Sequence, residues 1–295
     1  MLKKIALAIL AVVGFILTFG SEGAYNSGIS FGEEDRQTIT LSHMSWDDTL
    51  SSTAVITNVL EDEGFDVELI QLDPAILFSS VAEGESDFSV SPWLPRTHQT
   101  YMDQYGENID LLGAHIEGAE VAMVVPTYME DINSIEDLSD EANQTVTGIE
   151  PGAGITEQMS EAMANYDNLS DWDHQQSSTG AMLTSLGQAL SNEEEIVIPG
   201  WTPHWKFIEY DLKMLEDPQG GFGTAENLST IARQGFEEDN PVAYQIIDNF
   251  NLHIDDMQEI MLSLHDGMSP EAAARQWMDE NPEKVAEWTE GIDDL

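Results

Sequence analysis

The chain of 295 residues is long enough to bury a large core and to form two lobes. It carries 56 Asp and Glu against 9 Lys and Arg, a formal net charge of −47, and such a surface repels the phosphates of nucleic acids, so we expect no nucleic-acid partner. The 41% hydrophobic content is that of a globular protein and not of a disordered acidic tail. Because most carboxylates lack a basic partner, we predict a halophilic protein whose stability depends on screening by cations.

The first 36 residues are predicted to direct export. Residues 1–24 have the pattern of a signal peptide or N-terminal anchor, since Lys3 and Lys4 precede an apolar run over 5–19. This run is shorter than the ~20 residues that comfortably span a bilayer, which favours a cleaved signal. Residues 25–36 are expected to be a tether. The chain has no Cys, which excludes disulfides and the lipid-bearing Cys of an exported lipoprotein.

From residue 37 the chain alternates between strand and helix. We predict strands over 38–44, 65–72 and 87–91, separated by helices over 50–62 and 75–82, with Gly64 ending the first helix. This βαβαβ succession predicts a parallel sheet with right-handed crossovers. Further short strands are expected over 111–112 and 121–125.

A second α/β set is expected after Pro126. The pattern predicts strands over 145–149 and 195–198, helices over 155–165 and 180–190, and a return strand over 212–215. From Asn227 onward the chain is predicted to be entirely helical. Three helices there are expected to begin at a capping side chain followed by Pro, at Asn240, Ser269 and Asn281. We assign Trp277 and Trp288 to the core and give Trp172 no function.

Three Trp residues are candidates for a cation site. Trp201 follows the 195–198 strand in the stretch IVIPGWTPHW, and Trp46 and Trp93 follow two earlier predicted strands in the same way. Indole is the strongest side-chain partner for a cation over a ring face, and open α/β sheets keep ligands at the carboxyl ends of their strands. The competing interpretation of each Trp is ordinary core packing.

Two further stretches favour an anion. GIEPGAGI (148–155) places glycines between a strand and a helix, where free backbone N–H groups and the helix dipole suit one carboxylate or phosphate. It lacks the Lys-Ser/Thr of a Walker loop and the third Gly of the dinucleotide fingerprint. His98 in SPWLPRTH can donate a hydrogen bond to an anion, although a bond to the backbone is an equal alternative. Together these features predict a small zwitterion with a quaternary ammonium and a carboxylate.

Competing classes lack sequence support. There is no G-x-S-x-G elbow, no H-E-x-x-H and no His cluster with metal-ligand spacing, so we predict a protein that is not an enzyme, with no catalytic residue, metal or cofactor. A structural or adhesive surface protein is the other alternative, but it would have no use for Trp residues gathered at strand ends.

The chain resembles the substrate-binding proteins of glycine betaine ABC transporters, the group that includes OpuAC-like proteins, over about 37–281. The resemblance is carried by SHMSWDDTLSSTAVITNVLEDEGFDVELIQLD, SPWLPRTH, DINSIEDL, GIEPGAGI, VIPGWTPHW and YDLKMLEDPQGGFG. It implies that Trp46, Trp93 and Trp201 enclose a trimethylammonium group. It also implies that the backbone amides of Gly154 and Ile155, with His98, hold the ligand carboxylate. Trp205 is expected to pack behind these indoles.

The resemblance further implies an α/β, two-lobe type II periplasmic-binding-protein fold. Each lobe would be a mostly parallel sheet flanked by helices, with the ligand cleft between the lobes. We assign 37–125 to the first part of lobe 1, 126–221 to lobe 2, and 222–295 to a return to lobe 1 with a helical C-terminus. The missing lipoprotein Cys departs from the pattern and leaves the usual membrane tether in doubt.

The function implied is that of an extracytoplasmic substrate-binding protein of an ABC importer, capturing glycine betaine for osmoprotectant uptake. Its expected partners are this ligand and a membrane permease, and its expected location is the periplasm or the outer face of the cytoplasmic membrane. Choline, carnitine and proline betaine remain alternative ligands. A choline site would favour an acid in the pocket, and Asp47 beside Trp46 is the candidate.

Overall fold

The structure is a computed structural model that describes residues 37–292, within one compact unit, Arg36–Leu295. The predicted signal peptide or anchor and the predicted tether lie outside the described residues. No helix within 37–292 combines the length and the apolar character needed to cross a membrane.

The secondary structure alternates between strand and helix, as predicted, over most of the chain. The strands are β1 (Thr38–His43), β2 (Asp66–Gln71), β3 (Phe88–Ser89), β4 (Trp93–Leu94), β5 (Ile109–Pro126), β6 (Thr145–Thr147), β7 (Asp173–Gln175), β8 (Ile198–Thr202), β9 (Leu212–Met214) and β10 (Glu226–Arg233). The α-helices are α1 (Asp47–Asp62), α2 (Pro74–Ala82), α3 (Gln99–Tyr105), α4 (Gly154–Asn165), α5 (Thr179–Asn192), α6 (Lys206–Glu209), α7 (Phe236–Asp239), α8 (Pro241–Asn249), α9 (Ile254–His265), α10 (Pro270–Glu280) and α11 (Pro282–Trp288).

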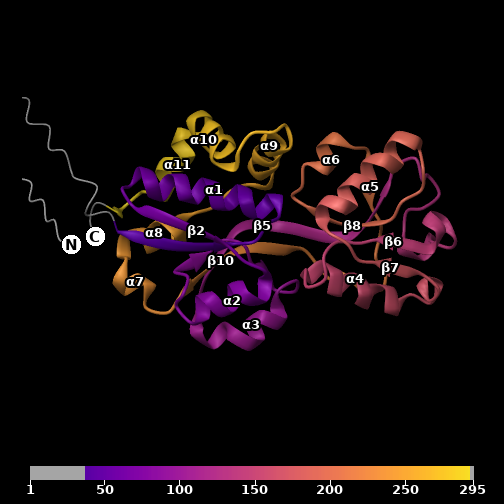
Figure 1. The fold of residues 1–295 in the computed structure, drawn as a ribbon, viewed down its shortest axis with the longest axis horizontal. Coiled ribbons are helices and arrows are strands. Elements are labelled where there is room, and N and C mark those ends of the chain that lie inside the picture. The colour runs from indigo at the N-terminus through magenta and orange to yellow at the C-terminus, as the bar shows by residue number, and fades with distance from the viewer. Residues whose placement is uncertain (1–36, 293–295) are drawn as a thin grey trace, which may run out of the picture. The chain divides into compact units, whose positions relative to one another are not determined.

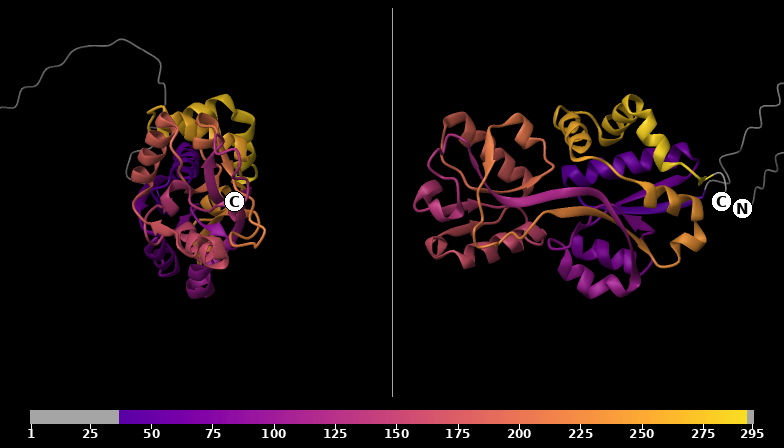
Figure 2. Two further views of the ribbon diagram at one scale, coloured as in Figure 1. Left: turned by 90° about the vertical axis from the view of Figure 1, so that its right-hand side faces the viewer. Right: turned by 180° about the vertical axis from the view of Figure 1, so that it is seen from behind.

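Lobe 1 is built on the strand order β2-β1-β3-β10-β5. β1 pairs in parallel with β2 and β3, which confirms the predicted βαβαβ unit, whereas β10 is antiparallel to both of its neighbours. Helices α1, α9 and α10 cover one face of this sheet, and α2 and α3 cover the other (Figures 1 and 2). Gly64 follows α1 with a φ of +95°, the left-handed conformation expected of a glycine at a helix end.

Lobe 2 repeats this arrangement with different strands. β5 pairs antiparallel with β8 on one side and with β9 on the other, and β6 pairs in parallel with β7. A parallel bridge between Val146 and Val197 joins β6 to the segment that enters β8. The resulting order β7-β6-β8-β5-β9 matches that of lobe 1, with β5 in the place of β10. The two-lobe α/β fold is therefore confirmed.

One strand is shared by the two lobes. β5 is a continuous strand of 18 residues that pairs with β10 as far as Ala119 and with β8 from Glu120 onward, and Figure 1 shows it running through both sheets. The sequence predicted two short strands here because Gly113 and Gly118, both with positive φ, interrupt the apolar pattern. Contacts join residues 36–295 into one unit, so the predicted lobe boundaries 37–125, 126–221 and 222–295 stay predictions.

The prediction that the chain is entirely helical from Asn227 onward is wrong, because β10 occupies this position. Residues 228–232 are all buried, so both faces of this partly polar strand are covered, and the strand pairs with β5 on one edge and with β3 and β4 on the other. Because the segment contains several polar residues, it shows neither a continuous apolar run nor an apolar alternation, and no strand was predicted there. The strand predicted over 212–215 is confirmed as β9, which pairs with β5 in lobe 2, and the chain then returns to lobe 1 through β10.

The C-terminal helices begin at Pro as predicted, but only one of the three predicted caps forms. The Ser269 hydroxyl accepts a hydrogen bond from the backbone N–H of Ala272 at the start of α10. The side chains of Asn240 and Asn281 make no capping bond, and the Asn281 amide donates instead to the carbonyl of Trp277. Helix formation at these sites therefore rests on the proline and on packing.

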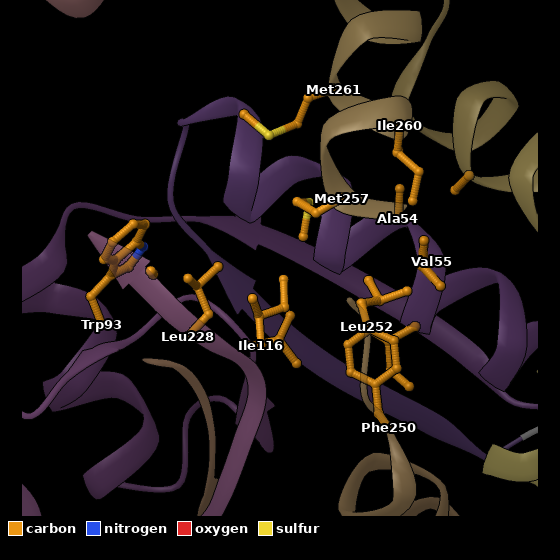
Figure 3. Packing of buried hydrophobic residues seen from close by; sticks show 14 of the residues in the cluster. Ala54, Val55, Trp93, Ile116, Leu228, Phe250, Leu252, Met257, Ile260 and Met261 are labelled. Atoms are coloured by element: carbon orange, nitrogen blue, oxygen red, sulfur yellow. The ribbon is translucent and has the colours of Figure 1, made fainter. Parts of the chain in front are cut away.

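The hydrophobic core of lobe 1 extends to Trp93, one of the three candidate cation-binding Trp residues. Trp93 lies beside Leu228, its partner in the β4–β10 pairing, and Figure 3 shows both at one end of a cluster that α9 covers with Met257 and Ile260. Trp277 and Trp288 are buried and stacked, as the core assignment predicted. Trp172 is also buried, and its indole N–H donates to the carbonyl of Ser139, which is a structural role.

Few of the Asp and Glu side chains form ion pairs. Among the described residues Arg and Lys pair with the carboxylates of Asp62, Asp87, Glu161, Asp239 and Glu287. The remaining carboxylates repel one another at low ionic strength, since the Debye length then exceeds their spacing.

We therefore expect the melting temperature to rise by about 10 °C between millimolar and molar NaCl, as screening adds a few kcal/mol of stability at roughly 2–4 °C per kcal/mol. Differential scanning calorimetry measures this. Sodium sulfate at matched ionic strength is the control for solute exclusion, which acts through apolar surface. Equal melting temperatures at low and high salt would contradict the prediction.

Candidate functional site

All six residues predicted to bind a ligand line one cavity. Trp46, Trp93 and Trp201, which we call the indole cage, share it with His98, Gly154 and Ile155. The other lining residues are Asp48, Thr97, Val121, Ile149 and Ala153. The lining comes from both lobes, because α4 and β8 belong to lobe 2 whereas α1, β4 and the start of α3 belong to lobe 1.

The three indoles come from three different local structures. Trp46 is the N-cap residue of α1, directly after β1, and Trp93 lies in β4. Trp201 was predicted just past a strand over 195–198, but β8 begins only at Ile198, so Trp201 lies inside the strand. Pro199 and Gly200 gave the appearance of a strand end, yet both pair with β5.

Hydrogen bonds hold the edges of two indoles. The Trp93 Nε1–H donates to Asp48 Oδ2 at 2.9 Å, and the Trp46 Nε1–H donates to Glu150 Oε1. Since an indole N–H lies in the plane of the ring, these bonds fix the ring without occupying its face. A cation–π site needs that face to be free.

Trp201 contacts a buried amine. Lys206 Nζ lies 4.0 Å from the centroid of the Trp201 ring, is fully buried, and makes no hydrogen bond within the described residues. Burial holds the pKa of Lys206 well below its usual value, while Asp48 and Asp47 oppose that shift. The amine thus packs against the ring of a cage residue.

His98 presents one free hydrogen-bond donor. The backbone N–H of Trp93 donates to His98 Nδ1 at 2.8 Å, which makes Nδ1 an acceptor. Burial lowers the pKa of His98 to about 3, so the ring is neutral and its proton is on Nε2. Nε2 has no partner among the described residues, although the side chain is 0% exposed. An N–H group that is buried without an acceptor is costly, and an anion in the cavity would relieve that cost.

Gly154 begins α4 at a point where the lobes meet. Its amide and that of Ile155 belong to the first helical turn, where N–H groups have no partner within the helix. A Cβ on Gly154 would lie 2.2 Å from the carbonyl oxygen of Thr97 in lobe 1. Only glycine permits this approach, which brings the helix start to the cavity beside His98.

Sequence reasoning named the wrong acid. Asp47 does not line the cage cavity; its Oδ2 accepts a hydrogen bond of 2.6 Å from Trp205 Nε1. Trp205 stacks on His265 with ring centroids 3.6 Å apart and lies outside the cavity lining, as expected. Asp48 lines the cavity instead, with Oδ1 unpaired, and burial raises the pKa of Asp48 to about 6. Two acids in a first helical turn are ordinary, so no sequence signal separates them.

The described residues form no candidate metal-binding site. Within 37–292 no group of three or more His, Asp and Glu side chains is placed to hold a metal ion.

Two lobes of like topology, joined by a shared strand and lined by aromatic residues from both sides, define the class of type II substrate-binding proteins. Residues 37–280 match the family described as the substrate binding domain of the ABC-type glycine betaine transport system, and the chain belongs to this family. The family is one of extracytoplasmic transport proteins and is not a family of enzymes.

The similarity extends to individual proteins. The chain is 45% identical over 168 residues to the glycine betaine/carnitine transport binding protein GbuC of Listeria monocytogenes serotype 1/2a (strain 10403S), covering 57% of this chain and 56% of that relative. It therefore spans little more than half the length of that relative.

Two solved structures are similar over nearly their whole length. Lactococcal OpuAC, in a closed-liganded conformation with glycine betaine, has a TM-score of 0.84 and 45% identity, covering 86% of this chain and 100% of that one. The glycine/betaine/L-proline-binding protein ProX of Borrelia burgdorferi has a TM-score of 0.81 and 30% identity, covering 85% and 96%.

The raised pKa of Asp48 implies that the free energy of unfolding depends on pH. A buried acid with a raised pKa costs nothing below about pH 4, where it is protonated in both states, and its full penalty is present above about pH 6. The shift from 3.8 corresponds to about 3 kcal/mol at roughly 1.4 kcal/mol per pKa unit. We expect Asp48→Asn, which keeps an oxygen acceptor for Trp93, to stabilise the protein at pH 7.5 and to be neutral at pH 4.

Urea unfolding of both proteins at the two pH values measures this difference. Asp66→Asn is the control, because Asp66 is an exposed acid on β2 and should show no such dependence. A free-energy difference between Asp48→Asn and the parent that is equal at both pH values would show the inference to be wrong.

Proposed function

We propose that this chain is the substrate-binding protein of an ABC importer that captures glycine betaine in the indole cage for osmoprotectant uptake. It delivers the ligand to a membrane permease. Residues 1–24 act as a signal peptide or anchor, which puts the protein in the periplasm or on the outer face of the cytoplasmic membrane. Membership of the family and the similarity to a structure that contains glycine betaine support this proposal.

The cage suits a quaternary ammonium. A trimethylammonium group is permanently charged but has no N–H, so it gains no hydrogen bond from a carboxylate and is attracted by the faces of aromatic rings. Each desolvated contact of this kind is worth on the order of 2 kcal/mol. The cavity lined by Trp46, Trp93 and Trp201 supplies three such rings.

The unpaired Nε2–H of His98 is the observation that carries the choice of glycine betaine. It supplies a neutral donor on the same cavity as the indoles, beside the free amides of Gly154 and Ile155. A ligand with a carboxylate a few atoms from its ammonium satisfies these donors and the rings at once. Hydrogen bonds to a charged acceptor are the stronger kind, at roughly 1.5–3 kcal/mol each.

Choline is a second candidate on one observation. Asp48 lines the same cavity, and its unpaired Oδ1 is a suitable acceptor for a ligand hydroxyl. Carnitine and proline betaine share the cation and the carboxylate of glycine betaine and belong to the same test panel.

Removing one cage residue tests the cation site. We expect Trp93→Ala or Trp201→Ala to weaken glycine betaine binding tenfold or more, because each removes a ring face and about 1.4 kcal/mol is a decade in Kd. Isothermal titration calorimetry in molar salt measures the affinity. Trp172→Phe, a change at a buried Trp away from the cavity, should keep the parental Kd. Parental affinity in both cage variants would exclude the cage.

Removing His98 tests the anion site. We expect His98→Ala to raise the Kd for glycine betaine at least tenfold more than the Kd for choline, since the two ligands share the cation and only one has a carboxylate. The ratio of the two Kd values cancels damage to the cage itself. An unchanged ratio would sink the assignment of His98 to the carboxylate, and a parent that prefers choline would favour the second candidate.

A further inference from the structure

One acidic side chain bonds to both lobes next to the cage. Glu150 lies in the glycine-rich turn before α4, and its Oε1 accepts the Nε1–H of Trp46 from lobe 1. Its Oε2 accepts the backbone N–H of Thr179 at 2.7 Å, and the Thr179 hydroxyl lies within 3.1 Å of both oxygens. Glu150 is thus anchored on the first residue of α5 in lobe 2 while it holds a cage indole of lobe 1.

Trp46 is the cage residue whose orientation is least fixed by packing. Trp93 and Trp201 are buried at 4% and 5% exposure, whereas Trp46 is only partly buried. Within lobe 1 its ring stacks on His98, with centroids 6.3 Å apart and an angle of 11°. The contact that fixes its N–H edge comes from Glu150, so the orientation of Trp46 depends on the position of lobe 2.

The backbone of Glu150 also shapes the anion side of the cavity. Its carbonyl accepts hydrogen bonds from the Thr156 hydroxyl at 3.0 Å and from the Ala153 amide at 3.4 Å. These bonds close the turn that presents the amides of Gly154 and Ile155. One residue is therefore bonded to a ring of the cation site through its side chain and to the anion turn through its backbone.

We propose that Glu150 is a positioning residue that couples closure of the lobes to completion of the cage. The Trp46–Glu150 bond forms only when lobe 2 lies against lobe 1, and it then sets the Trp46 ring for the ligand. Opening removes the bond, frees the ring and lowers affinity for the cation. The coupling rests on the proposed function, since it acts on ligand held by the cage.

Two variants remove the bond from opposite ends. Glu150→Ala removes the acceptor, and Trp46→Phe keeps an aromatic ring but lacks the N–H. We expect each to raise the Kd for glycine betaine about tenfold, mainly through faster dissociation, because the bond forms after the ligand has entered. Glu150→Gln, which keeps one oxygen acceptor, should fall between Glu150→Ala and the parent. Glu157→Gln is the control, as it removes an exposed acid from the first turn of α4.

The double variant separates coupling from general damage. If Glu150 acts through the Trp46 N–H, combining Glu150→Ala with Trp46→Phe should raise the Kd little beyond either single change, a non-additivity that a double-mutant cycle reports. Fold-changes in Kd that multiply would overturn the proposal, as would parental affinity in Glu150→Ala. If Glu150→Ala does not fold, Glu150→Met, which keeps the length of the side chain but has no oxygen acceptor, takes its place in the cycle.

Failure of the proposed function has a different outcome. A parent protein that binds no quaternary ammonium would overturn the proposed function. A parent that binds glycine betaine and is weakened by Trp93→Ala, but keeps its Kd in Glu150→Ala, would leave the proposed function standing and overturn the coupling alone.

Discussion

The site depends on the contact between Gly154 and the carbonyl of Thr97. A single added methyl group would come within 2.2 Å of that oxygen, so the two lobes meet there only because a hydrogen atom stands in for a side chain. This approach brings the first turn of α4, with its unpaired amides, against the loop that carries Trp93 and His98. The anion donors and the cation rings are assembled by one close contact between backbones.

Two buried residues that line the cavity each use one polar atom in a hydrogen bond and keep another without a partner. His98 uses Nδ1 to accept from the chain and keeps Nε2–H free, and Asp48 uses Oδ2 for Trp93 and keeps Oδ1 free. Burial keeps the first neutral and raises the pKa of the second to about 6. A bound ligand with matching polar groups supplies the partners that these two atoms lack.

The sequence was informative wherever one local pattern decided the outcome. The parallel βαβαβ unit, the helices over 50–62, 75–82, 155–165 and 180–190 and the glycine turn before α4 follow from apolar spacing and turn residues. The same reasoning singled out three Trp residues and His98, whereas Gly154 and Ile155 were named only from the family resemblance. β10 could not be found, because burial on both faces comes from neighbours far along the chain and leaves no apolar pattern in a segment containing Ser229 and Thr230. Whether Asp48 or Asp47 lines the cavity depends on the rotation of α1 about its axis, which the sequence does not specify. The role of Glu150 depends on its contact with Trp46, a residue far away in the sequence.

The shared strand β5 has a mechanical consequence. The same backbone belongs to both sheets and exchanges partners between Ala119 and Glu120. A small change in backbone torsion there rotates one lobe relative to the other, so this point of β5 can act as a hinge. One cluster of buried apolar residues includes members of both lobes. Holding a solute therefore depends on a few dihedral angles of this strand, on the interlobe hydrogen bonds and on the apolar contacts made where the lobes meet.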